Sequence, residues 1–146
     1  MSNIYVFDAC ALIALINDED GSDKVEIILK EAMDEKAEIY MSTINILEIY
    51  YGIYREEGQD KADETYQRIM KQPINIIDVI EEKVLKIAGR IKANYRLSLA
   101  DSIVLGLAIT KSAVVVTSDH HEFDIIEEKE LFTANCLCLD PATIPW

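Results

Sequence analysis

Short apolar runs alternate along the chain with longer amphipathic stretches. Runs of a few residues rich in Val, Ile and Tyr predict buried strands, and apolar residues recurring every three or four positions predict helices. Strands are expected at residues 3–7, 38–41, 74–78, 113–117 and 135–139. Helices are expected at residues 9–16, from 21–23 to near 36, from 42–43 through 54, 60–71, 81–94 and 98–110.

This order of elements predicts the fold class. Strands that are separated by helices need crossover connections, which make the strands parallel and cover both faces of the sheet. We therefore expect an α/β fold with a central, mainly parallel sheet. The chain has 146 residues and no linker-like segment or repeat, so residues 1–146 are expected to form a single domain.

Apolar runs and cysteine usage predict a cytoplasmic protein. The longest apolar runs, 9–16 and 103–109, fall short of the roughly 18 residues that a membrane-spanning helix needs. No basic segment precedes the first apolar run, so no signal peptide is expected. The three cysteines Cys10, Cys136 and Cys138 form neither an even disulfide set nor a Cys-x-x-Cys pair, which fits a reducing compartment.

The charge of the chain is strongly negative. Its 27 acidic and 14 basic residues give a formal net charge of −13. Such a charge argues against a broad electrostatic grip on nucleic acid. Bound divalent cations would reduce the local repulsion of nucleic acid, because a metal ion can be the largest local charge in its site.

Three carboxylates stand in apolar surroundings. Asp8 is the only charge within residues 1–17, Glu48 the only one within 39–54, and Asp101 the only one within 97–110. A buried carboxylate must be neutralised, paired with a cation or bound to a metal, because its desolvation is costly.

A fourth carboxylate, Asp119, follows the predicted strand 113–117 much as Asp8 follows the strand 3–7. The carboxyl ends of parallel strands form the ligand crevice of α/β sheets. We therefore expect Asp8, Glu48, Asp101 and Asp119 to converge there. Such an oxygen-rich cluster suits Mg²⁺ or Mn²⁺.

Each acid except Glu48 also has a structural alternative. Asp8 and Asp119 can serve as helix caps, and residues 98–101 (Ser-Leu-Ala-Asp) match a capping box. Glu48 lies beyond the first helical turn from Ser42 or Thr43, so capping does not explain it.

These residues together resemble a known family. The similarity rests on residues 8–15 (Asp-Ala-Cys-Ala-Leu-Ile-Ala-Leu), 46–48 (Ile-Leu-Glu), 99–101 (Leu-Ala-Asp) and 116–123 (Val-Thr-Ser-Asp-His-His-Glu-Phe). In this order and spacing they resemble the PIN-domain ribonucleases, especially the VapC-type toxins of toxin–antitoxin systems.

The resemblance implies a three-layer α/β/α fold and metal-dependent endoribonuclease activity on RNA. It implies Mg²⁺ or Mn²⁺ held by Asp8, Glu48, Asp101 and Asp119, with Thr117 as a supporting hydroxyl. Homodimers and an antitoxin protein as partner are typical of the toxin group. Cys10 departs from the Ser or Asn common at its position, so no role is carried over to it, and Asp124 is either an additional outer acid or a surface residue.

Other assignments stay open at this point. Arg90, Lys92, Arg96 and Arg55 can contact RNA phosphates or simply cover a solvated helix face. The chain can also be a PIN-like module that binds a partner without catalysis. A third alternative is a Mg²⁺-dependent phosphotransferase or phosphatase with Asp8 as nucleophile, although Cys10 stands where the haloacid-dehalogenase pattern needs a second Asp.

Overall fold

The computed structural model describes residues 3–118, 123, 126 and 133–136. The helices within these residues are α1 (Ala9–Ile16), α2 (Ser22–Met33), α3 (Thr43–Glu57), α4 (Gln59–Met70), α5 (Glu82–Asn94) and α6 (Leu99–Lys111). The strands are β1 (Asn3–Phe7), β2 (Ala37–Ser42), β3 (Asn75–Ile77), β4 (Val114–Thr117) and β5 (Thr133–Cys136). None of the helices described is long and apolar enough to cross a membrane.

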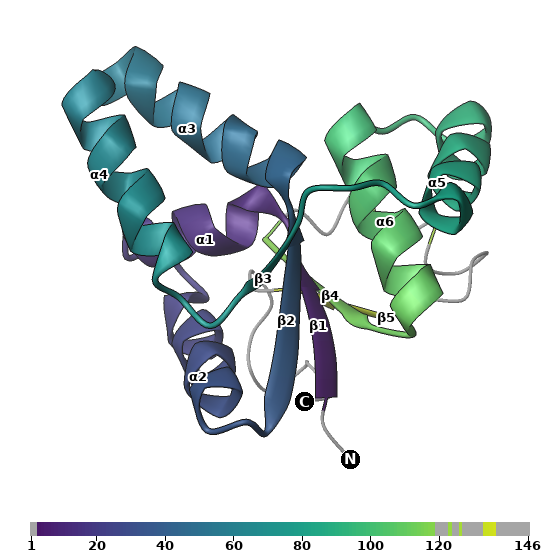
Figure 1. Cartoon of the computed structure of the whole chain (residues 1–146), viewed down its shortest axis with the longest axis horizontal. Helices are drawn as coiled ribbons and strands as arrows, with labels where there is room; N and C mark the ends of the chain where they lie inside the picture. Colours follow the sequence, from purple (N-terminus) through teal and green to yellow (C-terminus); the bar gives the residue numbers. More distant parts are fainter. Residues whose placement is uncertain (1–2, 119–122, 124–125, 127–132, 137–146) are drawn as a thin grey trace.

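The strands form one sheet with β1 at its centre, in the order β3-β2-β1-β4-β5. All four strand pairs are parallel, as the sequence predicts. In Figure 1, α1 to α4 lie on one side of the sheet, and α5 and α6 lie on the other. The expectation of an α/β/α fold with a parallel sheet is confirmed.

Successive side chains of β1 and β4 point to opposite faces of the sheet and so contribute to two separate hydrophobic cores. Phe7 and Val116 face the core shared with α1 to α4, whereas Val6 and Val115 face the core shared with α5 and α6. All four side chains are fully buried. Because both faces of these strands are covered, they read in the sequence as continuous apolar runs.

Helices α1, α2 and α6 are each followed by a residue that has a left-handed backbone conformation but is not glycine. These residues are Asp18, Glu35 and Ser112, with φ of 52°, 60° and 51°. The amide after each donates to the carbonyl five residues back at 2.8 Å, which is the Schellman arrangement. This arrangement ends α2 at Met33, three residues before the predicted end near Lys36, because Glu35 leaves the helical conformation.

The last strand also differs from its prediction. β5 begins at Thr133, two residues before the predicted start at Asn135. Its register pairs Val114 with Thr133, so its position is set by β4 rather than by its own weak apolar pattern. The predicted residues 137–139 lie outside the part that the structure describes.

Helices α5 and α6 approach closely at Gly106. A Cβ atom at this position would lie 3.0 Å from the Val84 carbonyl oxygen and 3.2 Å from the Ala88 Cβ. Gly106 is buried within α6, so this contact joins the two helices that cover one face of the sheet.

Replacing Gly106 tests this packing. We expect Gly106→Ala to lower the free energy of unfolding by about 1 kcal/mol or more, because overpacking outweighs the gain in helix propensity. Gly89→Ala in α5 is the matched control, since nothing lies within 4 Å of its added Cβ, and it should raise stability by about 0.5–1 kcal/mol. Urea unfolding of both variants gives the comparison, and equal stabilisation by both would contradict the close contact.

Candidate active site at the carboxyl end of the sheet

Asp8 and Thr117 are neighbours at the carboxyl end of the two central strands. The register of β1 and β4 pairs Phe7 with Val116, and Asp8 and Thr117 are the next residues of these strands. The Asp8 amide donates to the Val116 carbonyl at 3.4 Å, which extends this pairing beyond β1. Thr117 is fully buried, so its hydroxyl lies inside the protein, on the strand paired with β1.

Asp8 is a helix cap, as the structural alternative predicted. It is 3% exposed, and its Oδ1 accepts a hydrogen bond from the Ala11 amide at 3.0 Å, at the start of α1. This bond uses one of about four lone-pair positions of a carboxylate. Capping and ion binding by Asp8 are therefore compatible.

Glu48 lies on α3, which begins directly after β2. Ser42 ends the strand and caps the helix, because its Oγ accepts from the Ile44 amide at 3.1 Å. The Glu48 side chain is partly buried, and its Oε1 accepts from Asn45 Nδ2 at 3.1 Å. Burial raises the pKa of Glu48, and the bond from Asn45 opposes this rise.

Asp101 lies in the first turn of α6. Its amide donates to Ser98 Oγ at 3.1 Å, so the hydroxyl half of the predicted capping box is present. The turn at Ser112 leads α6 back into β4, and the start of α6 therefore lies toward the carboxyl end of the sheet (Figure 1). A carboxylate in the first turn is also favoured by the helix dipole.

Three of the four predicted acids thus lie toward one end of the sheet. Asp119 and Asp124 lie outside the described residues, so the proposed ring of four remains a prediction. Within the residues that the structure describes, no three His, Cys, Asp or Glu side chains form a group that could hold a metal ion. The donors that Asp8, Glu48 and Asp101 offer are all carboxylate oxygens, and this chemistry suits Mg²⁺ or Mn²⁺.

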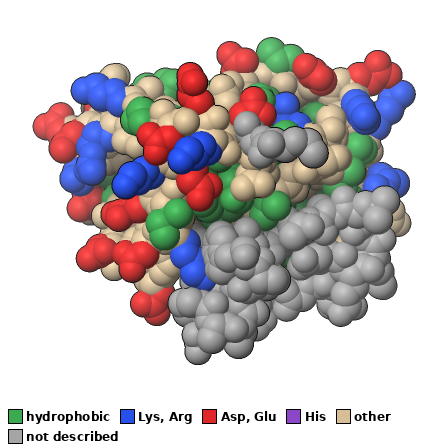
Figure 2. All heavy atoms as spheres, turned by 90° about the horizontal axis from the view of Figure 1, so that it is seen from below, with side chains coloured by type: hydrophobic (Ala, Val, Ile, Leu, Met, Phe, Trp, Pro, Cys, Tyr) green, Lys and Arg blue, Asp and Glu red, His purple; other side chains and the backbone are tan. Residues whose placement is uncertain are grey.

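Several of the basic residues considered for RNA have local contacts, Lys92 and Arg55 among them. Lys92 Nζ donates to the Leu97 carbonyl at 3.0 Å, and the Arg55 guanidinium lies 5.4 Å from the centre of the Tyr51 ring. On the described part of the face in Figure 2, Lys and Arg side chains are scattered among Asp and Glu without a continuous basic surface. On this face the arrangement agrees with the expectation, from the net charge of −13, that the protein lacks a broad electrostatic grip on nucleic acid.

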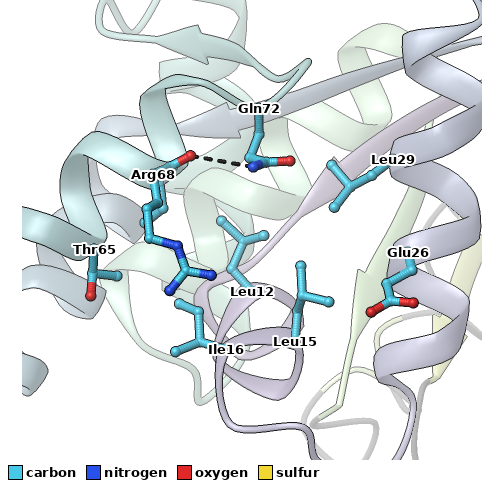
Figure 3. A pocket seen from close by; sticks show the side chains of 9 residues that line it. Leu12, Leu15, Ile16, Glu26, Leu29, Thr65, Arg68 and Gln72 are labelled. Atoms are coloured by element: carbon cyan, nitrogen blue, oxygen red, sulfur yellow. Dashed lines mark hydrogen bonds between the residues drawn. The ribbon is translucent and has the colours of Figure 1, made fainter.

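The structure also shows a pocket that the sequence analysis did not predict. It lies between α1, α2 and α4 and has a volume of about 390 Å³. Leu12, Leu15 and Leu29 line it, and Arg68 and Glu26 reach it from opposite sides (Figure 3). It forms where α1 and α2 pack against the more distant α4, so no pattern within one helix could reveal it.

Comparison with known proteins identifies the family. A family model described as PIN domain matches residues 5–129. The chain belongs to the PIN domain family. This finding confirms the resemblance seen in the motifs around Asp8, Glu48, Asp101 and Asp119.

Solved PIN structures share this fold at low sequence identity. The DNA-bound VapBC complex from Salmonella typhimurium aligns with a TM-score of 0.71 and 16% identity, covering 94% of this chain and 100% of its own. VapBC-1 from nontypeable Haemophilus influenzae gives 0.70 and 17%, covering 93% and 99%. VapC20 from Mycobacterium tuberculosis, described as a Sarcin-Ricin loop cleaving toxin, gives 0.60 and 14%, covering 86% and 95%. A comparison with curated protein sequences finds no match.

The raised pKa of Glu48 predicts a pH-dependent stability. A pKa raised by folding means that the folded state binds the proton more tightly, so stability decreases as pH rises through that pKa. In a metal-free buffer at pH 7, Glu48→Gln should therefore raise Tm by about 1–2 °C, because a partly buried charge is removed. The gain should disappear at acidic pH.

Thermal unfolding in EDTA across a pH series measures this difference. Glu64→Gln on α4 is a suitable control, since that side chain is exposed. A gain for Glu48→Gln that persisted unchanged at acidic pH would show that it does not come from the ionised carboxylate.

Proposed function

We propose that the protein is a metal-dependent endoribonuclease that cleaves RNA phosphodiester bonds and is the toxin of a toxin–antitoxin pair. The observation that carries this proposal is the position of three isolated carboxylates toward the carboxyl end of a PIN-family sheet. Asp8, Glu48 and Asp101 are each the only charge in an apolar stretch of the chain. The structural neighbour VapC20, described as a cleaving toxin, supports the same reaction class.

Nucleases of the PIN family generally use divalent metal ions. In this protein, Asp8 and Asp101 would hold Mg²⁺ or Mn²⁺, and Glu48 and Asp119 would bind it directly or through water. A divalent ion bound there supplies charge stabilisation for the scissile phosphate and acidifies a water molecule. It would also offset the negative charge of the protein next to the RNA.

The chain itself contributes the orientation of the carboxylates. Capping fixes Asp8 at the start of α1, and the buried Thr117 would supply a supporting hydroxyl to the acidic cluster. On α3, Glu48 Oε1 accepts a hydrogen bond from Asn45 Nδ2 at 3.1 Å.

Asparagine substitutions separate capping from catalysis. Asp8→Asn keeps an oxygen that can cap α1, and Asp101→Asn leaves the amide that donates to Ser98. Both variants should fold normally but lose Mg²⁺- or Mn²⁺-dependent RNA cleavage by about 100-fold or more. Gel assays on purified RNA measure the loss.

Asp34→Asn, at the exposed end of α2, is the matched control and should cleave at the wild-type rate. Wild-type cleavage by both site variants would show that a contaminating nuclease produces the signal.

An antitoxin partner is the second part of the proposal. Four of the aligned structures are described as VapBC or as a toxin–antitoxin complex. The pocket between α1, α2 and α4 offers an apolar floor to a peptide, with Arg68 and Glu26 able to pair with charges of either sign beside it. We assign this pocket to an amphipathic segment of the antitoxin.

A charge placed in the pocket tests this assignment. Leu15→Glu should reduce co-purification with the proposed antitoxin by about 10-fold or more, because a carboxylate would be buried against apolar side chains. Leu85→Glu on α5 is the control, since Leu85 is 58% exposed and does not line the pocket. Equal capture of both variants would exclude the pocket from the interface.

The remaining expectations are part of the same proposal. The resemblance implies a homodimer, which sedimentation of the purified protein tests. The apolar runs and the cysteine usage predict a cytoplasmic location. The non-catalytic binding module predicts no divalent-cation binding in calorimetry. Cys10, which stands where the haloacid-dehalogenase pattern needs a second Asp, disfavours the phosphotransferase alternative.

A further inference from the structure

Asn45 is a buried polar residue in which only one of the two polar side-chain atoms forms a hydrogen bond within the described structure. It is 1% exposed and lies in the first turn of α3. Its Nδ2 donates to Glu48 Oε1 at 3.1 Å. Its Oδ1 is buried and has no hydrogen-bond partner within the described structure. Buried polar atoms are nearly always paired, so this asparagine needs an explanation.

Helix capping does not explain Asn45. A polar side chain in the first turn can bond back to the amides at the helix start. Asn45 Oδ1 accepts from no such amide within the described structure, and the cap of α3 is Ser42, whose Oγ accepts from the Ile44 amide at 3.1 Å.

Packing does not explain it either. Two other buried side chains of α3, Ile46 and Ile49, are apolar and contribute to the core beneath the helix. An apolar residue at position 45 would avoid an unpaired buried oxygen. The bond to Glu48 is therefore the feature that distinguishes Asn45 from an apolar residue.

We propose that Asn45 is a positioning residue that holds the Glu48 carboxylate in the orientation from which it binds the divalent ion. This inference rests on the proposed metal-dependent function. A glutamate has several rotatable bonds, and a fixed donor three residues before it on the same helix restricts the carboxylate to one region. Hydrogen-bond partners behind a metal ligand commonly set its orientation in this way.

Substitution by leucine separates positioning from structure. Asn45→Leu removes the donor together with the unpaired oxygen. The variant should bind Mn²⁺ about 10- to 100-fold more weakly in calorimetry without RNA. Its Tm in EDTA should stay equal to that of the wild type or rise, because the unpaired buried oxygen is gone. Asn45→Ala gives the same affinity comparison should leucine prove too large for the site.

A glutamine variant and a double mutant sharpen the test. Asn45→Gln keeps the amide donor and should recover part of the lost affinity. In a Glu48→Ala background, adding Asn45→Leu should cause no further loss, because Asn45 acts through Glu48. Asn75→Leu is the matched control, since its Nδ2 also donates at 3.1 Å, but to the Ile39 carbonyl, and it should leave Mn²⁺ affinity unchanged.

The outcomes distinguish this inference from the proposed function. A wild-type protein that neither binds Mn²⁺ nor cleaves RNA would overturn the metal-dependent function, and the role of Asn45 with it. Wild-type binding together with an Asn45→Leu affinity within about 2-fold of it would overturn only the positioning role. A lower Tm with unchanged affinity would likewise show that Asn45 is purely structural.

Discussion

Parallel pairing of β1 with both β2 and β4 is the constraint on which the rest of the structure depends. Because all the strands run in one direction, each carboxyl end emerges at the same edge of the sheet. Asp8 follows β1, Thr117 ends β4, and α3 carries Glu48 away from the end of β2. The separate apolar cores on the two faces keep this arrangement rigid. Residues at the strand ends, and on the helices beside them, can therefore come together in one functional site.

Capping a helix leaves most lone pairs of the Asp8 carboxylate available for other partners. Asp8 satisfies an amide at the start of α1, and the Asp101 amide completes the cap at the start of α6. Both contacts lie at helix starts, where amides without helical partners and the helix dipole favour negative groups. The fold thus stabilises buried or half-buried carboxylates before any cation binds. Glu48 lacks such support and depends on one amide from Asn45.

The sequence predicted the architecture well because both central strands are covered on both faces and read as apolar runs. It also singled out Asp8, Glu48 and Asp101, since an isolated charge in an apolar stretch is visible without coordinates. It did not predict the bond from Asn45 to Glu48, because asparagine in a first helical turn has several common roles. The pocket beside Leu12 depends on how three helices pack, and periodicity within one helix carries no such information. The end of α2 was missed because glycine, the usual signal, is replaced by Glu35.

The three residues with left-handed backbone after α1, α2 and α6 affect the thermal stability of the protein. Asp18, Glu35 and Ser112 each hold a backbone conformation that costs a residue with a Cβ atom about 1–2 kcal/mol. Glu35 and Ser112 precede β2 and β4, at the amino end of the sheet, and Asp18 lies in the connection after α1. The protein therefore carries conformational strain that glycine at these positions would relieve, offset in part by the greater freedom of glycine in the unfolded chain. Glycine substitutions at these three positions would therefore change the thermal stability of the protein without altering a residue of the candidate site.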